Sequence, residues 1–181
     1  MTTIDNNAYG VQTASDTVRV ERLLPGPIER VWAYLTDSEK RKKWLAGGEM
    51  ELRAGGRVNL FFHHSEITFE PTPERFKFME KGIHSQCEVT EFDPPRLLAM
   101  TWPDDGHASE VMFELFPEGD KVLLVLTHRK LPGKAEMANV SSGWHAHLAV
   151  LAALLEGREA SGFWSSVIRL EDEYKKRFGA E

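Results

Sequence analysis

Short turns between successive strand-like segments constrain this chain most. Residues 84–92, 97–102, 109–116 and 121–129 are rich in the apolar, β-branched and aromatic side chains that are typical of strands. The segments are separated by turn-forming residues, namely Asp93-Pro94-Pro95, Pro103-Asp104-Asp105-Gly106 and Pro117-Glu118-Gly119-Asp120. Because a parallel pair of strands needs a crossover of a dozen or more residues, connections this short predict an antiparallel meander.

The N-terminal half adds further strands and two short helices. Apolar residues spaced i, i+3, i+4 and i+7 predict an amphipathic helix over residues 28–35, and Thr36-Asp37-Ser38 offers a cap for a second helix over 39–44. The other patterns predict strands over residues 17–24, 49–53 and 57–64. Residues 65–82 show neither a strand nor a helix pattern and contain two prolines. We expect a long loop there with one helical turn, and the sequence leaves open whether this loop acts as a lid.

The C-terminal part of the chain is predicted to be helical. Residues 144–155 are apolar around much of a helical wheel, with Gly157 as the stop signal, and residues 163–178 carry a narrower apolar stripe. The predicted class is therefore α+β, with a curved antiparallel sheet wrapped around a long C-terminal helix. We expect a flexible tail at residues 1–15, one domain over 16–157, and a helical extension of that domain over 158–181.

The composition and net charge limit the number of domains, the cellular location and the partners that we expect. A chain of 181 residues fits one domain, and its single cysteine permits no internal disulfide. The net charge of −6 argues against nucleic acid as a partner. No apolar run is long enough for a membrane span and no secretory signal is visible, so we expect a cytoplasmic protein. The basic run Lys40-Arg41-Lys42-Lys43 is interpreted as a solvated helix face.

Taken together, the segments also resemble a known superfamily. The matching segments are residues 27–32, Trp44, and residues 55–57, 93–102, 111–115 and 143–157. In this order and spacing they are similar to the helix-grip superfamily of START, Bet v allergen and polyketide cyclase domains. The closer resemblance is to the bacterial branch named after the C-terminal domain of the activator of heat-shock-protein-ninety ATPase. This resemblance implies a helix-grip fold with a cavity, and no particular reaction.

The first functional hypothesis is a module that binds a small hydrophobic or aromatic ligand between the sheet and the long helix. The expected ligand-binding residues are Trp102, Phe113, Leu124, His128, Trp144, His147 and Leu151. His128 shares the strand face of Val122, Leu124 and Leu126, so it points inward and must meet either a hydrogen-bond partner or a ligand. We expect no cofactor and no metal, because the histidine and cysteine spacings do not suit chelation.

Two other classes of function remain open. A cyclase- or hydrolase-like enzyme on the same fold would use His128 or His84 as general base, although the sequence fixes no catalytic set and we assign no activity. A protein-interaction module of co-chaperone type would bind a chaperone through an exposed surface. The apolar stripe of residues 163–178 is also suited to a homodimer contact.

Overall fold

The computed structural model describes residues 3–104 and 107–180, and these residues build one seven-stranded sheet. The sheet order is β1-β2-β7-β6-β5-β4-β3, and every pair of neighbours is antiparallel. The strands are β1 (Val11–Ala14), β2 (Thr17–Pro25), β3 (Arg57–Phe62), β4 (Ile83–Asp93), β5 (Leu97–Asp104), β6 (His107–Glu118) and β7 (Lys121–Arg129). Strands β4 to β7 are the predicted meander.

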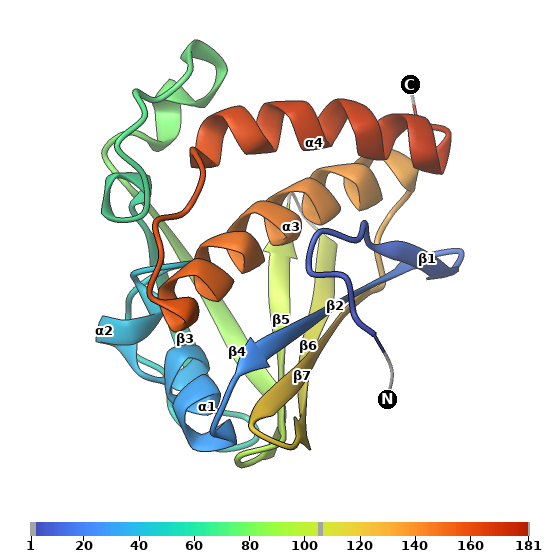
Figure 1. Ribbon diagram of the computed structural model, residues 1–181. Helices are drawn as coiled ribbons and strands as arrows, with labels where there is room; N and C mark the ends of the chain where they lie inside the picture. Colours follow the sequence, from blue (N-terminus) through green and yellow to red (C-terminus); the bar gives the residue numbers. More distant parts are fainter. Residues whose placement is uncertain (1–2, 105–106, 181) are drawn as a thin grey trace.

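The described residues also form four α-helices and two short 3-10 helices. They are α1 (Ile28–Thr36), α2 (Ser38–Arg41), η1 (His64–Glu66), η2 (Glu74–Met79), α3 (Lys134–Glu156) and α4 (Phe163–Phe178). Helix α3 lies across the sheet, and α4 packs alongside α3 (Figure 1). The α+β class and the helix-grip arrangement are as predicted.

Helix α3 is longer than its apolar pattern suggested. It begins at Lys134, not near Trp144, and ends at Gly157 in the left-handed conformation, φ +69°. The first turns carry Glu136, Asn139 and two serines, and these polar residues hide the helical period. Glu136, Asn139 and Ser142 are accommodated because they line a cavity, described below.

Helix α4 buries its apolar stripe within the same chain. Phe163, Trp164, Val167, Leu170, Tyr174 and Phe178 are all buried. They recur at helical spacing on one face, as expected for an amphipathic helix that packs on a neighbour. The neighbour is α3, so the stripe that we considered for a homodimer contact is covered inside the protomer.

The N-terminal segment differs from the flexible tail expected for residues 1–15. Val11–Ala14 form strand β1, which pairs with β2. The Asn6 side chain makes two hydrogen bonds with the backbone of Leu23, and the Gly10 N–H donates to the Tyr174 hydroxyl at 2.7 Å. The partners lie up to 164 residues away in the chain, so no local pattern could have indicated these contacts.

Two local predictions before β3 are corrected. The strand predicted over residues 49–53 is reduced to one isolated bridge, Met50 to Val58, and a second bridge, Gly47 to Phe61, precedes it. Gly48, between the two bridges, interrupts the extended backbone with φ +113°. A Cβ at Gly48 would lie 1.9 Å from the Asn59 carbonyl oxygen, so this approach requires glycine. The second short helix is a single turn that ends at Arg41.

The predicted basic helix face is wrong at one position. Lys40 and Lys43 are exposed, but Arg41 is only 1% exposed. Its guanidinium donates to four backbone carbonyls, those of Leu35, Thr36, Ala46 and Gly48. Arg41 therefore joins the end of α1 to the segment that leads toward β3.

Candidate functional site

A cavity of about 430 Å³ lies between the sheet, the first half of α3 and the start of α4. Its walls come from β3, β4, β5, α3, α4 and the segment between β3 and β4. The part of that segment over residues 65–82 is called the 65–82 segment below. The lining residues are Leu45, Leu60, Phe62, His64, Phe76, Phe78, Met79, Ile83, Ser85, Cys87, Trp102, Glu136, Asn139, Val140, Ser142, Gly143, Trp144, His147, Phe163, Trp164 and Val167. Most of this wall is apolar or aromatic.

Aromatic rings contact one another around the cavity. The ring centroids of Trp102 and Trp144 are 4.9 Å apart, and Phe62 meets Trp102 edge to face at 5.7 Å. Elsewhere in the wall, Phe76 of the 65–82 segment stacks on Trp164 of α4 at 4.7 Å. Such faces and edges are suited to flat apolar molecules.

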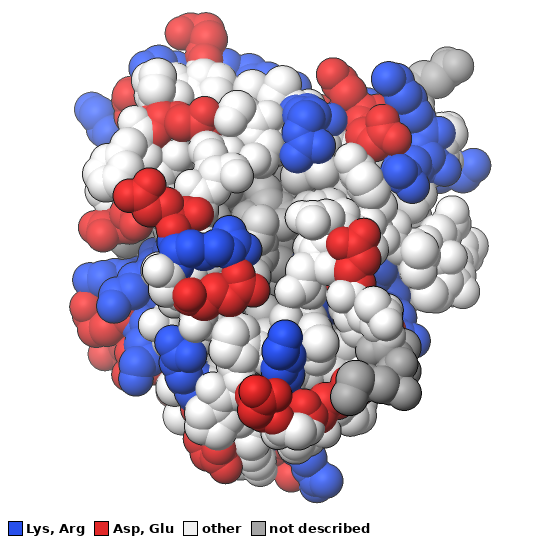
Figure 2. Space-filling view, in the orientation of Figure 1, with Lys and Arg blue, Asp and Glu red and all other residues white. Residues whose placement is uncertain are grey.

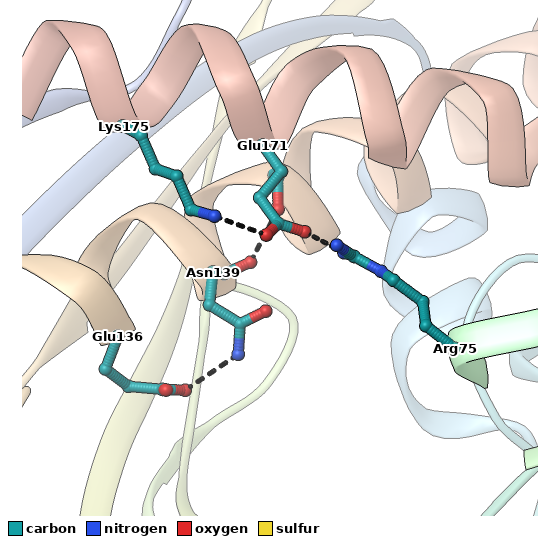
Figure 3. A network of polar contacts seen from close by, with 6 residues as sticks. Arg75, Glu136, Asn139, Glu171 and Lys175 are labelled. Atoms are coloured by element: carbon teal, nitrogen blue, oxygen red, sulfur yellow. Dashed lines mark hydrogen bonds and ion pairs between the residues drawn. The ribbon is translucent and has the colours of Figure 1, made fainter. Parts of the chain in front are cut away.

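Formal charge is scarce in the cavity. Among its described lining residues there is no lysine or arginine, and Glu136 is the only carboxylate. The Glu136 carboxylate accepts a hydrogen bond from the Asn139 amide at 3.1 Å (Figure 3). On the outer surface, Lys and Arg side chains lie next to Asp and Glu around an uncharged central region (Figure 2).

Two buried histidines stand side by side in the cavity wall. The rings of His64 and His147 are 5.9 Å apart, and His64 lies 4.6 Å from the Trp164 ring. Burial lowers the pKa of His64 to about 4 and that of His147 to about 3; His63 further disfavours protonation of His64, and His64 further disfavours protonation of His147. Both imidazoles are therefore uncharged at neutral pH.

Three of the seven predicted ligand-binding residues line the cavity: Trp102, Trp144 and His147. The structure places Phe113, Leu124 and Leu151 in the packed core, away from the cavity wall.

His128 is the remaining predicted ligand-binding residue that does not line the cavity. It is fully buried and binds two neighbours. The Trp144 indole N–H donates to its Nδ1 at 2.9 Å, and its Nε2 lies 2.6 Å from the Ser109 hydroxyl. His128 thus orients Trp144, which does line the cavity.

The other candidates from the sequence are dispersed. His84 is exposed and stacks on Phe61 at 4.3 Å, so neither proposed general base lines the cavity. Cys87 does line it, but burial raises the pKa of its thiol to about 12, which keeps it protonated. The described part of the chain holds no group of three or more His, Cys, Asp and Glu side chains suited to a metal ion.

Sequence reasoning missed much of the wall. Glu136 and Asn139 were missed because the start of α3 was placed too late. Phe163 is predicted only as part of the apolar stripe of residues 163–178, and Trp164 is not singled out, although two adjacent aromatic residues at a helix start are a signal that could have indicated the cavity wall. His64 is not among the predicted ligand-binding residues, because its inward position depends on the turn η1 after β3.

The 65–82 segment is attached to α4 by polar and aromatic contacts. Glu171 of α4 binds Arg75 of this segment and also Lys175 of its own helix, the latter at 2.9 Å (Figure 3). Burial works against ionisation of Glu171, but hydrogen bonds from Arg75 and Lys175 outweigh it and hold the pKa of its carboxyl below the usual value. Together with the stacking of Phe76 on Trp164, the ion pair holds the 65–82 segment against α4, and this segment contributes Phe76, Phe78 and Met79 to the cavity wall.

Replacing Glu171 should loosen this closure. In Glu171→Gln we expect chymotrypsin to cleave at the exposed Phe69 or Phe78 roughly 2–5 times faster, since a partly exposed ion pair contributes about 0.5–1 kcal/mol to the closed state. Glu173→Gln is the matched control, because Glu173 pairs with Arg177 within α4. Equal cleavage rates in the two variants would show that the ion pair does not hold the segment.

The described helices include none that is both long and apolar enough to cross a membrane. A curved antiparallel sheet that grips a long helix above a lined cavity defines a START-like, helix-grip protein. Within that superfamily, the chain belongs to the family described as Activator of Hsp90 ATPase homolog 1-like protein, which matches residues 25–156. The resemblance inferred from the sequence is thereby confirmed.

Solved structures agree with this assignment. The chain is similar to the protein encoded by gene BPP1335 from Bordetella parapertussis, with 44% identity over 93% of this chain and 90% of that chain and a TM-score of 0.82. CalU16 from Micromonospora echinospora shares 23% identity over 91% and 86% of the two chains, with a TM-score of 0.66. EF2215 from Enterococcus faecalis, a conserved protein of unknown function, shares 19% over 96% and 91%, with a TM-score of 0.67. The last two show the fold alone. Comparison with curated proteins finds no match.

Proposed function

We propose that this protein binds a small hydrophobic or aromatic molecule in the cavity between the sheet and α3. The observation that carries the proposal is the cavity itself, about 430 Å³ in volume and walled mainly by apolar and aromatic side chains. This volume is within the range of about 300–1,000 Å³ found for small-molecule sites. We propose no catalytic or chaperone function, because no observation on the described residues favours one.

The polarity of the wall supports an apolar ligand. A charged ligand buried here would lose its hydration and find few opposite charges, which is costly in a low-dielectric site. The apolar part of a ligand would instead contact rings that are already packed in place, such as Trp102 and Trp144. A site that is formed before binding loses less conformational entropy when it is occupied.

Gly143 provides a specific way to test the proposal. It lines the cavity from the middle of α3, and a Cβ built there meets no atom within 4 Å. Gly143→Leu should therefore fill cavity space without a backbone clash, and it removes a helix-destabilising glycine worth about 1 kcal/mol. Ala149→Leu is the matched control, since Ala149 is an exposed residue of the same helix.

The experiment is a thermal-shift screen of apolar and aromatic compounds on the three proteins. A ligand present at 100 times its Kd stabilises the folded state by about 2.7 kcal/mol, which corresponds to roughly 5–10 °C in Tm for a chain of this size. We expect such a shift for the wild type and Ala149→Leu, and none for Gly143→Leu. If no compound shifts the wild type, or if Gly143→Leu responds equally, ligand binding in this cavity is wrong.

A further inference from the structure

We propose that His64 and His147 make the cavity selective for uncharged aromatic molecules that carry a hydroxyl group, the chemical class of the phenols. This inference rests on the proposed binding function and narrows its ligand. The two side chains lie in the same wall with their rings 5.9 Å apart, near enough to address one polar group, or adjacent polar groups, of one ligand.

The hydrogen bond of His147 determines what its free nitrogen can do. Its Nδ1 lies 2.7 Å from the Trp44 carbonyl oxygen. A carbonyl oxygen can only accept, so Nδ1 carries the proton, and Nε2 of the uncharged ring is an acceptor. No described residue provides a hydrogen bond to that Nε2. A ligand that enters the cavity with an O–H group would supply the missing donor.

His64 has the complementary arrangement. Its Nδ1 is buried and has no partner among the described residues. A proton on that nitrogen would be a buried donor without an acceptor, which is the more costly state, so the favoured tautomer carries its proton on Nε2. His64 thus provides a donor and His147 an acceptor. A hydroxyl group can accept from one and donate to the other.

The charges of the lining residues argue against a carboxylate ligand, whether aromatic or aliphatic. The described lining offers no lysine or arginine to such an anion, and the carboxylate of Glu136 would repel it. Neither imidazole supplies a positive charge at neutral pH, because burial keeps the pKa of both rings at about 4 or below. The other titratable group acting on His64 is His63, which further disfavours its protonation.

The surroundings of the two histidines favour an aromatic ligand over an aliphatic alcohol. Phe163 lies 4.7 Å from the His147 ring and 5.1 Å from the His64 ring, and Trp164 lies 4.6 Å from His64. The hydroxyl-binding nitrogens therefore sit among π faces, where a flat ring gains offset or edge contacts.

Three probes with one ring system test this selectivity: naphthalene, 2-naphthol and 2-naphthoate at pH 7.5, each titrated by tryptophan fluorescence. We expect wild-type protein to bind 2-naphthol about ten times more tightly than naphthalene, the factor that corresponds to one buried hydrogen bond, and to bind 2-naphthoate most weakly. In His147→Phe and His64→Phe the preference for 2-naphthol over naphthalene should fall below about threefold, with naphthalene binding retained. His84→Phe is the control, because His84 is exposed and does not line the cavity.

The outcomes separate this inference from the proposed function. If naphthalene binds as tightly as 2-naphthol, or 2-naphthoate binds most tightly, the hydroxyl selectivity is wrong while cavity binding stands. Retention of the full preference in both histidine variants would assign it to other residues and overturn the role of the pair. If none of the probes binds the wild type, and the compound screen is also flat, the proposed function fails as well. The wild-type series alone decides the selectivity, even if a variant does not fold.

Discussion

Lowering the pH from 7 to 5 is expected to reduce the free energy of unfolding by roughly 6 kcal/mol, about 2 kcal/mol for each of the buried histidines His64, His145 and His147. Burial lowers the pKa of His64 and His145 to about 4 and that of His147 to about 3. Below the ordinary value of 6.5 the unfolded chain binds protons that the folded chain does not. The stabilisation is therefore complete above pH 6.5 and is lost as the pH falls toward the folded pKa values.

The surroundings of these rings oppose protonation from several sides. His145 lies near Arg22, Arg169 and Arg177, all of which lower its pKa. Its Nδ1 is 2.8 Å from the Tyr174 hydroxyl, an interaction that is made inside the helix pair α3 and α4. For His147, only the hydrogen bond with the Trp44 carbonyl favours the charged form, and burial outweighs it.

Urea unfolding at pH 7, 6 and 5 measures the effect. His147→Phe should reduce the dependence on pH by about one third, since one of three titrating groups is removed. His84→Gln is the matched control, because this side chain is exposed in the folded protein. Carboxylates contribute little over this interval, since their ordinary pKa values lie near 4. A stability that stays constant between pH 7 and pH 5 would contradict the assignment of three neutral buried imidazoles.

Replacing Arg41 with methionine is expected to lower the free energy of unfolding by about 3–5 kcal/mol. Burial lowers the pKa of the Arg41 guanidinium to about 10, so it is still charged at neutral pH. It donates to the carbonyl of Ala46 at 3.0 Å and to that of Thr36 at 3.2 Å, among four carbonyls in all. Methionine keeps the apolar stem but leaves these buried acceptors without their donor.

The matched control for Arg41 is two residues further along the chain. Lys43 is exposed, and Lys43→Met should change stability by less than about 0.5 kcal/mol. Arg41→Lys should fall between the two, because one ammonium group cannot span the carbonyls on both sides. Chemical denaturation of the three variants gives the comparison. A loss in Arg41→Met no larger than that in Lys43→Met would refute the bridging role.

The amino-acid sequence determined the class of fold, because burial leaves a local periodicity in each element. Alternation in β7, short turns between β4 and β7, and the stripe on α4 could be recognised without any knowledge of what each element contacts. His145 and His147 are two residues apart in α3, a spacing that places them on different faces of a helix. In the structure, His145 contacts Tyr174 of α4 and His147 contacts the Trp44 carbonyl.

Only the tertiary structure decided which polar residues matter and what they do. His147 and Trp44 are 103 residues apart, Glu171 and Arg75 are 96 apart, and Gly10 and Tyr174 are 164 apart. Periodicity shows that a side chain is buried, but it does not identify the group that it meets, and for a polar side chain that partner sets its charge and its proton. The elements could therefore be predicted one at a time, whereas the cavity and its histidine pair required the whole chain to be folded.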